Sequence, residues 1–288
     1  MLIELAIGDA YGAGFEYVER KDVHPNNDLS YHQHPKHLGT KPGMYTDDTQ
    51  MSLAIAELIL DEQAWTPLNI ANKFVEVFKR DPREGYAEGF YHFLRKNTGG
   101  GEEFLEKIGA TSDKSGAAMR APVLGIFSDK DEVLEKAEIQ AALTHNTKDG
   151  INAAKASALI PHFFLWERGQ KKDLAKYLKA NVKGDWLSRW TGKVRSKGFM
   201  SVRAAITSIM ESSKMSELLK LCISYTGDVD TVAAIALAGA SVCPEIKQDL
   251  PYWLYGDLEN GTYGRDYIES LDTQLKAKIK AARQIEEE

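Results

Sequence analysis

The sequence predicts an all-α fold, a single compact domain of many helices. Apolar residues recur at helical spacing along most of the chain, whereas strand signals are few and no alternation of strands and helices is found. No internal repeat, low-complexity tract or shift in composition divides the 288 residues. That length suits one large domain or two small ones. We therefore expect residues 1–288 to form one domain.

The expected helices follow from apolar stripes and from capping residues. Thr66 and Pro67 begin one helix, and Thr49 or Asp48 is a plausible N-cap for the apolar run that starts at Met51. In chain order, the pattern predicts helices over residues 2–13 and 51–61, a helix from residue 67 that stops at a break over residues 81–85, and helices over 86–96, 131–144, 150–166, 171–180, 202–210, 216–224 and 232–242, and from residue 267 onward.

Several segments between these helices are expected to be loops. Residues 20–45 are polar, contain four histidines and three prolines, and are read as a long loop that could cover a site. The irregular spacing of the histidines favours a solvated loop over a metal site. The glycines of residues 12–14 are expected to form a close turn that aims Glu16. Residues 99–101 should end a helix, and residues 181–199 should be irregular and exposed.

Composition excludes several classes of protein. Hydrophobic residues make up 43% of the chain and the formal net charge is −6, so a general nucleic-acid binder with a basic face is not expected. No apolar run approaches the ~18 residues of a membrane span, and the first residues lack a signal peptide's features. The two cysteines, Cys222 and Cys243, suit a reducing compartment. We expect a cytoplasmic protein without a membrane partner.

Two acidic clusters stand out because each lies immediately before an apolar helical stretch. Residues 46–49 read Thr-Asp-Asp-Thr, and residues 227–231 read Gly-Asp-Val-Asp-Thr. Either cluster alone could simply cap a helix. Two clusters of the same design suggest instead that they face each other and share metal. The candidate metal ligands are Thr46, Asp47, Asp48, Asp228, Asp230 and Thr231.

The chemistry of these donors narrows the choice of metal. Carboxylate and hydroxyl oxygens suit Mg²⁺, Mn²⁺ or Ca²⁺, whereas the lack of cysteine or paired-histidine ligands disfavours zinc. Neither cluster follows the twelve-residue loop of an EF-hand. Four carboxylates could hold two ions through a bridging group, and without metal they would repel one another. Glu16 is a candidate acid or base, with an exposed structural glutamate as the alternative.

A small, polar stretch at residues 112–120 turns apolar at Ala121. Residues of this size let a backbone approach a ligand closely, and tight helix packing is the alternative interpretation. No P-loop is present, because residues 99–101 lack the following lysine and hydroxyl. Catalytic triads of the Ser-His-Asp type and Cys-His pairs find no local support either.

Five motifs in order resemble those of one family. They are Gly-Asp-Ala-Tyr-Gly-Ala-Gly-Phe-Glu-Tyr at residues 8–17, Thr-Asp-Asp-Thr-Gln-Met at 46–51, Ser-Gly-Ala-Ala-Met-Arg-Ala-Pro at 115–122, His-Asn at 145–146, and the second acidic cluster. The family is the ADP-ribosylglycohydrolases, which includes the dinitrogenase reductase-activating glycohydrolase and the ADP-ribosylarginine hydrolases. The motifs span residues 8–231, nearly the whole chain.

This resemblance implies an all-helical domain with a di-metal cleft that holds two Mg²⁺ or Mn²⁺ ions. By similarity, one ion would be held by Thr46, Asp47, Asp48 and Asp230, and the other by Asp228, Asp230 and Thr231. Glu16 and Asp47 would be the catalytic carboxylates. The substrate would be bound by Ser115, Gly116, Ala117, Met119 and His145.

The chain departs from the family pattern at two motifs. The second acidic motif more often reads Gly-Gly-Asp-Thr-Asp-Thr, whereas Thr226 and Val229 stand here in place of a glycine and a threonine. The expected metal ligands are retained, but the local turn could differ. The histidine motif continues with Asn146, Thr147 and Lys148 instead of Pro-Glu, which leaves the leaving group open.

The resemblance predicts a metal-dependent hydrolase that removes ADP-ribose from a modified acceptor by cutting the bond at the ribose C1″. The acceptor would be an ADP-ribosylated protein or another ADP-ribosylated molecule, and the enzyme would be a monomer. One alternative is an inert ADP-ribose-binding or structural protein of the same fold, like the lens crystallin of this family. Another is a di-metal hydrolase of a different nucleotide or phosphoester.

Overall fold

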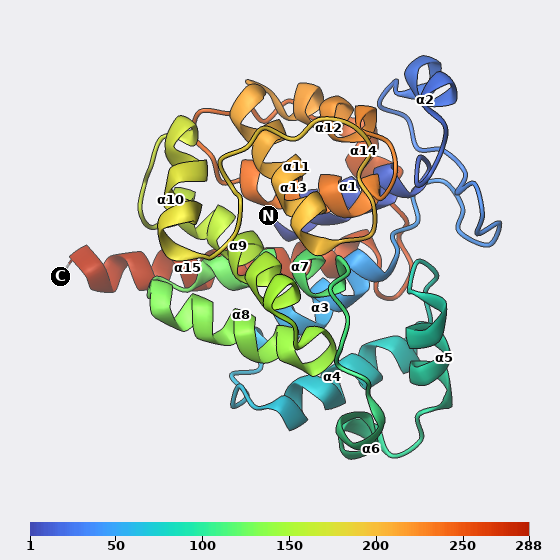
Figure 1. The fold of residues 1–288 in the computed structure, drawn as a ribbon, viewed down its shortest axis with the longest axis vertical. Coiled ribbons are helices and arrows are strands. Elements are labelled where there is room, and N and C mark those ends of the chain that lie inside the picture. Colours follow the sequence, from blue (N-terminus) through green and yellow to red (C-terminus); the bar gives the residue numbers. More distant parts are fainter. Residues whose placement is uncertain (288) are drawn as a thin grey trace.

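Helices account for the secondary structure of the computed structural model, which describes residues 1–287 (Figure 1). Within these residues the only β-type pairing consists of isolated bridges, so the predicted all-α fold is confirmed. The α-helices are α1 (Leu2–Ala13), α2 (Arg20–Asn26), α3 (Asp47–Leu60), α4 (Pro67–Arg80), α5 (Glu88–Lys96), α6 (Gly100–Lys107), α7 (Gly116–Met119), α8 (Lys130–His145), α9 (Lys148–Leu165), α10 (Leu174–Asn181), α11 (Gly198–Glu211), α12 (Met215–Ser224), α13 (Val229–Ala240), α14 (Tyr252–Gly256) and α15 (Arg265–Glu287). Two 3₁₀ helices span Ala121–Ile126 and Lys171–Asp173. None of the described helices is both long enough and apolar enough to cross a bilayer.

The centre of the core is the packing of α1 against α13, which come from opposite ends of the chain (Figure 1). Two glycines of α1 permit this close approach. A Cβ built on Gly8 would lie 2.6 Å from the backbone of Ala233, and one on Gly12 would lie 2.3 Å from the Cα of Asp230. These glycines therefore bring two helices together. Gly12 lies within the predicted helix over residues 2–13 and serves helix packing, whereas the turn expected to aim Glu16 begins only at Gly14.

The two acidic clusters lie in the first turns of α3 and α13. Both helices begin earlier than the apolar pattern predicted, because Thr46 and Asp228 occupy the N-cap positions. Carboxylates are stabilised at helix N-termini by the exposed N–H groups and the helix dipole. Asp47, Asp48 and Asp230 are consequently held by regular helical backbone rather than by flexible loops.

Several short helices were not predicted. Residues 20–26 form α2, which buries Val23 within the segment read as a loop. The glycines at 99–101 were expected only to end a helix, but they also begin α6. Glu103 accepts hydrogen bonds from the backbone N–H groups of Thr98 and Gly99, which satisfies donors at this helix start.

Candidate active site

A cavity of about 630 Å³, a size suited to a small ligand, brings most of the predicted site residues together. Its floor carries both acidic clusters, and its walls come from the segments around α5 and α7 and from the end of α8. The predicted site residues that line it are Glu16, Asp47, Asp48, Ser115, Gly116, Met119, His145, Asp228, Asp230 and Thr231. Tyr86, Phe90, Phe93 and Ile108 add an apolar wall.

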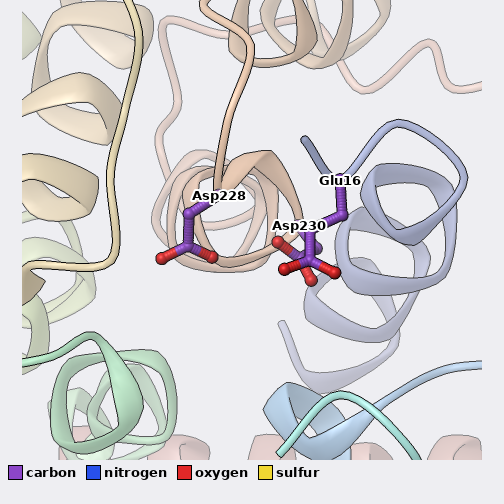
Figure 2. Close-up of side chains that lie close together, drawn as sticks. All are labelled: Glu16, Asp228 and Asp230. Atoms are coloured by element: carbon purple, nitrogen blue, oxygen red, sulfur yellow. The ribbon is translucent and has the colours of Figure 1, made fainter. Parts of the chain in front are cut away.

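Three carboxylates converge at the end of α1 and the start of α13. One oxygen each of Glu16, Asp228 and Asp230 lies within 4.8 Å of the others, a spacing that could hold a metal ion. Figure 2 shows Glu16 and Asp230 with their carboxylates together and Asp228 beside them. The backbone N–H of Tyr17 donates to the Gly227 carbonyl at 2.8 Å, which ties the turn bearing Glu16 to the second cluster.

The first cluster meets the second across the floor of the cavity. The pKa of Asp48 is raised well above its ordinary value by burial, then by the charges of neighbouring carboxylates that include Asp228. The Thr231 hydroxyl lies close enough to oppose that rise. Burial and the same kind of repulsion, from groups that include Glu16, raise the pKa of Asp47. The two clusters therefore form one electrostatic unit, as the sequence suggested.

Asp9 organises the first cluster, although no role for it was predicted. This fully buried carboxylate accepts four hydrogen bonds, from the backbone N–H and the hydroxyl of both Thr46 and Thr49, at 2.6–2.9 Å. It thereby fixes the first turn of α3. The sequence did contain a signal, because Asp9 interrupts an otherwise apolar helix and such a buried charge needs partners.

The 194–198 segment joins the second cluster to the small-residue loop. Val194 accepts from the N–H of Asp228 at 3.2 Å, and Ser196 accepts from the N–H of Ser115 at 3.0 Å. The prediction that this region is exposed was wrong at Val194, which is fully buried. Gly227 has a positive φ of 98°, and a Cβ on it would lie 1.7 Å from the Val194 carbonyl oxygen. This contact requires glycine in the second motif.

Gly85, a second residue that the sequence did not single out, covers the first cluster. Its φ is 103°, and an added Cβ would meet the Asp47 Oδ1 at 2.2 Å. The chain noted only as a break after α4 thus reaches the floor of the cavity. Only a residue without a side chain leaves Asp47 open to a ligand here.

His145 stands on the opposite wall as a neutral imidazole. Burial, followed by the nearby charge of Arg120, lowers the pKa of His145 to about 3. Arg120, which can only donate, binds the Thr144 hydroxyl at 3.0 Å, and that hydroxyl lies 2.7 Å from His145 Nδ1. We assign the Thr144 proton to this contact, which leaves His145 Nε2–H as a donor.

Two predicted site residues do not line the cavity. Ala117 is fully buried, and its carbonyl accepts from the side chain of Gln140 at 3.0 Å. Thr46 is also fully buried, and its hydroxyl donates to Asp9. Because the Thr46 hydroxyl is the donor in that bond, the lone pairs of its oxygen remain free, and Thr46 can still bind a cation. Ala117 contributes packing beneath the Ser115 loop.

A family model described as ADP-ribosylglycohydrolase matches residues 1–284. The chain belongs to the ADP-ribosylglycohydrolase family. Human ADP-ribosylhydrolase ARH3 is 28% identical over 193 residues, which cover 61% of this chain and 52% of ARH3. ADP-ribosylarginine hydrolase Tri1 of Pseudomonas putida is 25% identical over 263 residues, covering 83% of this chain and 68% of Tri1.

The chain spans about half the length of the ARH3 relatives that it matches. A solved structure, from an ADP-ribosylglycohydrolase-related protein complex, superposes with a TM-score of 0.70 and covers 96% of each chain. At 20% identity this similarity concerns the fold. The departure from the family motif at residue 226 is also visible, because Thr226 adopts a φ of 64°, a left-handed backbone that glycine adopts more easily.

The acidic floor of this family member fits a divalent cation. Among the described residues, Asp48 Oδ1, Asp228 Oδ2 and Asp230 Oδ1 are buried without a hydrogen-bond partner. Unpaired buried charges are costly, and a hard cation supplies the partners that these oxygens lack. These three donors are all oxygens, which suit hard cations such as Mg²⁺, Mn²⁺ or Ca²⁺ better than zinc.

Replacing Asp228 by asparagine should stabilise the protein in a chelator, in a pH-dependent way. Burial, then the charge of Glu16, raises the pKa of Asp228 from 3.8 to about 6. The folded state then holds a proton that the unfolded chain releases, so stability falls as the pH rises from about 4 to about 6. Asp228→Asn removes this pH-dependent loss of stability. Its free energy of unfolding should exceed that of wild type by about 2–3 kcal/mol at pH 7 and by almost nothing below about pH 4.

Denaturant unfolding in EDTA across this pH range measures the difference. The control is Asp149→Asn, an exposed carboxylate in the first turn of α9. It should show no such pH dependence. Adding Mn²⁺ at pH 7 should reverse the order of stability, so that wild type becomes more stable than Asp228→Asn. A difference that stays constant between pH 4 and pH 7 would contradict the prediction.

Proposed function

We propose that this protein is a metal-dependent hydrolase that removes ADP-ribose from a modified acceptor by cutting the bond at the ribose C1″. The observation that carries the proposal is the convergence of five carboxylates on the floor of one cavity, opposite Ser115 and His145. Membership of the ADP-ribosylglycohydrolase family supports it. We propose residues 1–288 as one catalytic domain, acting as a monomer in the cytoplasm, where both cysteines would stay unpaired.

We propose that the acidic floor holds two ions, Mg²⁺ or Mn²⁺. Thr46, Asp47, Asp48 and Asp230 would hold one, and Asp228, Asp230 and Thr231 the other. When bound, the ions would supply positive charge that holds the ribose hydroxyls beside the scissile bond. Three of these carboxylates carry the unpartnered oxygens described above, which supports their assignment as ligands.

The protein's own groups would perform the remaining tasks. Glu16 and Asp47 line the cavity, and either carboxylate can accept a proton from attacking water or assist departure of the leaving group. The Nε2–H of His145 can donate a hydrogen bond to the ligand without introducing a charge. Ser115, Gly116 and Met119 would contact the ADP-ribose, and Ala117 would support their loop from within.

The acceptor can be identified by comparing how much ADP-ribose the protein releases from different substrates. The protein is incubated with ADP-ribosylated arginine peptide, serine peptide and nucleic acid, with Mg²⁺, with Mn²⁺ or with EDTA, and free ADP-ribose is measured. We expect release from at least one protein-type substrate and none in EDTA. Tight binding of ADP-ribose without release from any substrate would favour the inert, crystallin-like alternative. Hydrolysis of simple phosphoesters instead would favour the alternative of a di-metal hydrolase that acts on a different nucleotide or phosphoester.

A further inference from the structure

His34 is buried within a segment that is otherwise largely open to solvent. Its side chain is 1% exposed, whereas its neighbours Gln33 and Pro35 are exposed. The sequence analysis placed it in a solvated loop with three other histidines. A buried imidazole needs partners for both ring nitrogens.

Both nitrogens of His34 are engaged. Nδ1 lies 3.1 Å from the backbone nitrogens of Lys36 and His37, which can only donate. Nδ1 is therefore an acceptor, and a neutral ring must carry its proton on Nε2. Nε2 lies 3.1 Å from Glu16 Oε2, so the ring donates this proton to the carboxylate. The turn at residues 34–37 thus sets the tautomer, and the tautomer sets the contact with Glu16.

We propose that His34 is a positioning residue that holds the Glu16 carboxylate toward Asp228 and Asp230. As far as it concerns turnover, this inference rests on the proposed function. Glu16 has three rotatable side-chain bonds, and its contact with His34 is the one side-chain hydrogen bond that it makes within the described residues. Its acidic neighbours repel it, and the hydrogen bond from the buried His34 ring holds one of its oxygens in a single place.

The segment that carries His34 is anchored at several points, which makes it a firm support. The ring of His32 packs edge-on against Phe15, with ring centres 5.1 Å apart. Gly14 leaves the space for His32, because a Cβ there would lie 2.8 Å from the His32 carbonyl oxygen. Further along, His37 Nδ1 lies 3.2 Å from Glu84 Oε2, next to the Gly85 that covers Asp47. The segment therefore links the turn bearing Glu16 with the chain above the first cluster.

Two substitutions separate the two roles of the imidazole. The Asn oxygen in His34→Asn can occupy the place of Nδ1 and accept the same backbone N–H groups, but the side chain is too short to reach Glu16. The amide of His34→Gln extends to about the place of Nε2 and can donate to Glu16. His24→Asn is the matched control, since His24 is an exposed histidine of the same polar segment and is not one of these anchors.

We expect His34→Asn to lower kcat about 10- to 100-fold, as for the loss of a group that orients a metal-site ligand, with little change in KM. His34→Gln should restore most of the rate, and His24→Asn should match wild type. An equal loss in His34→Asn and His34→Gln would overturn the proposal, because the contact with Glu16 would then not be what matters. A wild-type kcat in His34→Asn would also overturn the proposal.

Two further measurements do not depend on turnover. Nitrogen NMR of the metal-free protein should show the ring proton of His34 on Nε2 and Nδ1 as an acceptor. A proton on Nδ1 would overturn the proposal. Because Glu16 is spaced with Asp228 and Asp230 to hold a metal ion, calorimetry should show about tenfold weaker Mn²⁺ binding in His34→Asn, restored in His34→Gln. Unchanged Mn²⁺ affinity in His34→Asn would also overturn it. If these results hold while no substrate releases ADP-ribose, the proposed function fails and the positioning role stands.

Discussion

Replacing Asp230 by asparagine is expected to reduce bound Mn²⁺ from two ions to at most one, and to lower ADP-ribose release by about 10³-fold. Asp230 lies in the first turn of α13, is 4% exposed, and has a buried oxygen without a hydrogen-bond partner. We propose it as the shared ligand of both ions, so its loss affects each of them. Calorimetry with Mn²⁺ and the initial rate of ADP-ribose release measure the two effects.

The fold itself should tolerate this change. Burial, followed by repulsion from Glu16, Asp228 and other carboxylates, raises the pKa of Asp230 well above its ordinary value. Asp230→Asn removes a buried acid that is unfavourable without metal, so the variant should melt at or above the wild-type temperature in EDTA. Asp149→Asn again serves as the control, because it makes the same change in an exposed first turn. Two bound Mn²⁺ ions and a near wild-type rate in Asp230→Asn would refute the shared role.

Replacing Gly12 by alanine should destabilise the protein by about 3 kcal/mol and lower Tm by about 5–10 °C. The new Cβ would lie 2.3 Å from the Cα and 2.7 Å from the backbone nitrogen of Asp230. Both contacts are to the backbone of a packed helix, so no rotamer change relieves them. The better helix propensity of alanine offsets only about 1 kcal/mol. Thermal unfolding in EDTA measures the result.

Gly256→Ala provides the matched control for this prediction. Gly256 ends the short helix α14, and a Cβ there has no heavy atom within 4 Å. Its stability should change little or rise slightly. Because Gly12 contacts Asp230, we expect Gly12→Ala also to weaken Mn²⁺ binding, whereas Gly256→Ala should not. Equal stability of the two variants would show that α1 and α13 can separate without cost.

The acidic floor was largely predictable, and the reason is local. Asp47, Asp48, Asp228 and Asp230 each lie at the start of an apolar helix, so one chemical pattern occurs twice in the sequence. The all-α fold was predictable because the apolar stripes are long. The exact helix starts were not, since an apolar stripe begins only after the polar first turn that the dipole stabilises.

The residues that support the floor could not be assigned from the sequence, because their partners are distant along the chain. Asp9 binds Thr46 and Thr49, His34 binds Glu16, and nothing near either residue indicates its partner. Gly85 looked like an ordinary break until the structure placed it over the Asp47 carboxylate. Such contacts depend on how helices pack, which local spacing does not encode.

The distance between the two acidic clusters along the chain has a kinetic consequence. Asp48 in α3 and Asp228 at the start of α13 are far apart along the chain, so we expect the complete floor to form late in folding. Interactions absent from the folding transition state change the unfolding rate and leave the folding rate almost unaltered. Ions bound at this floor would therefore lengthen the lifetime of the native protein without helping it to form.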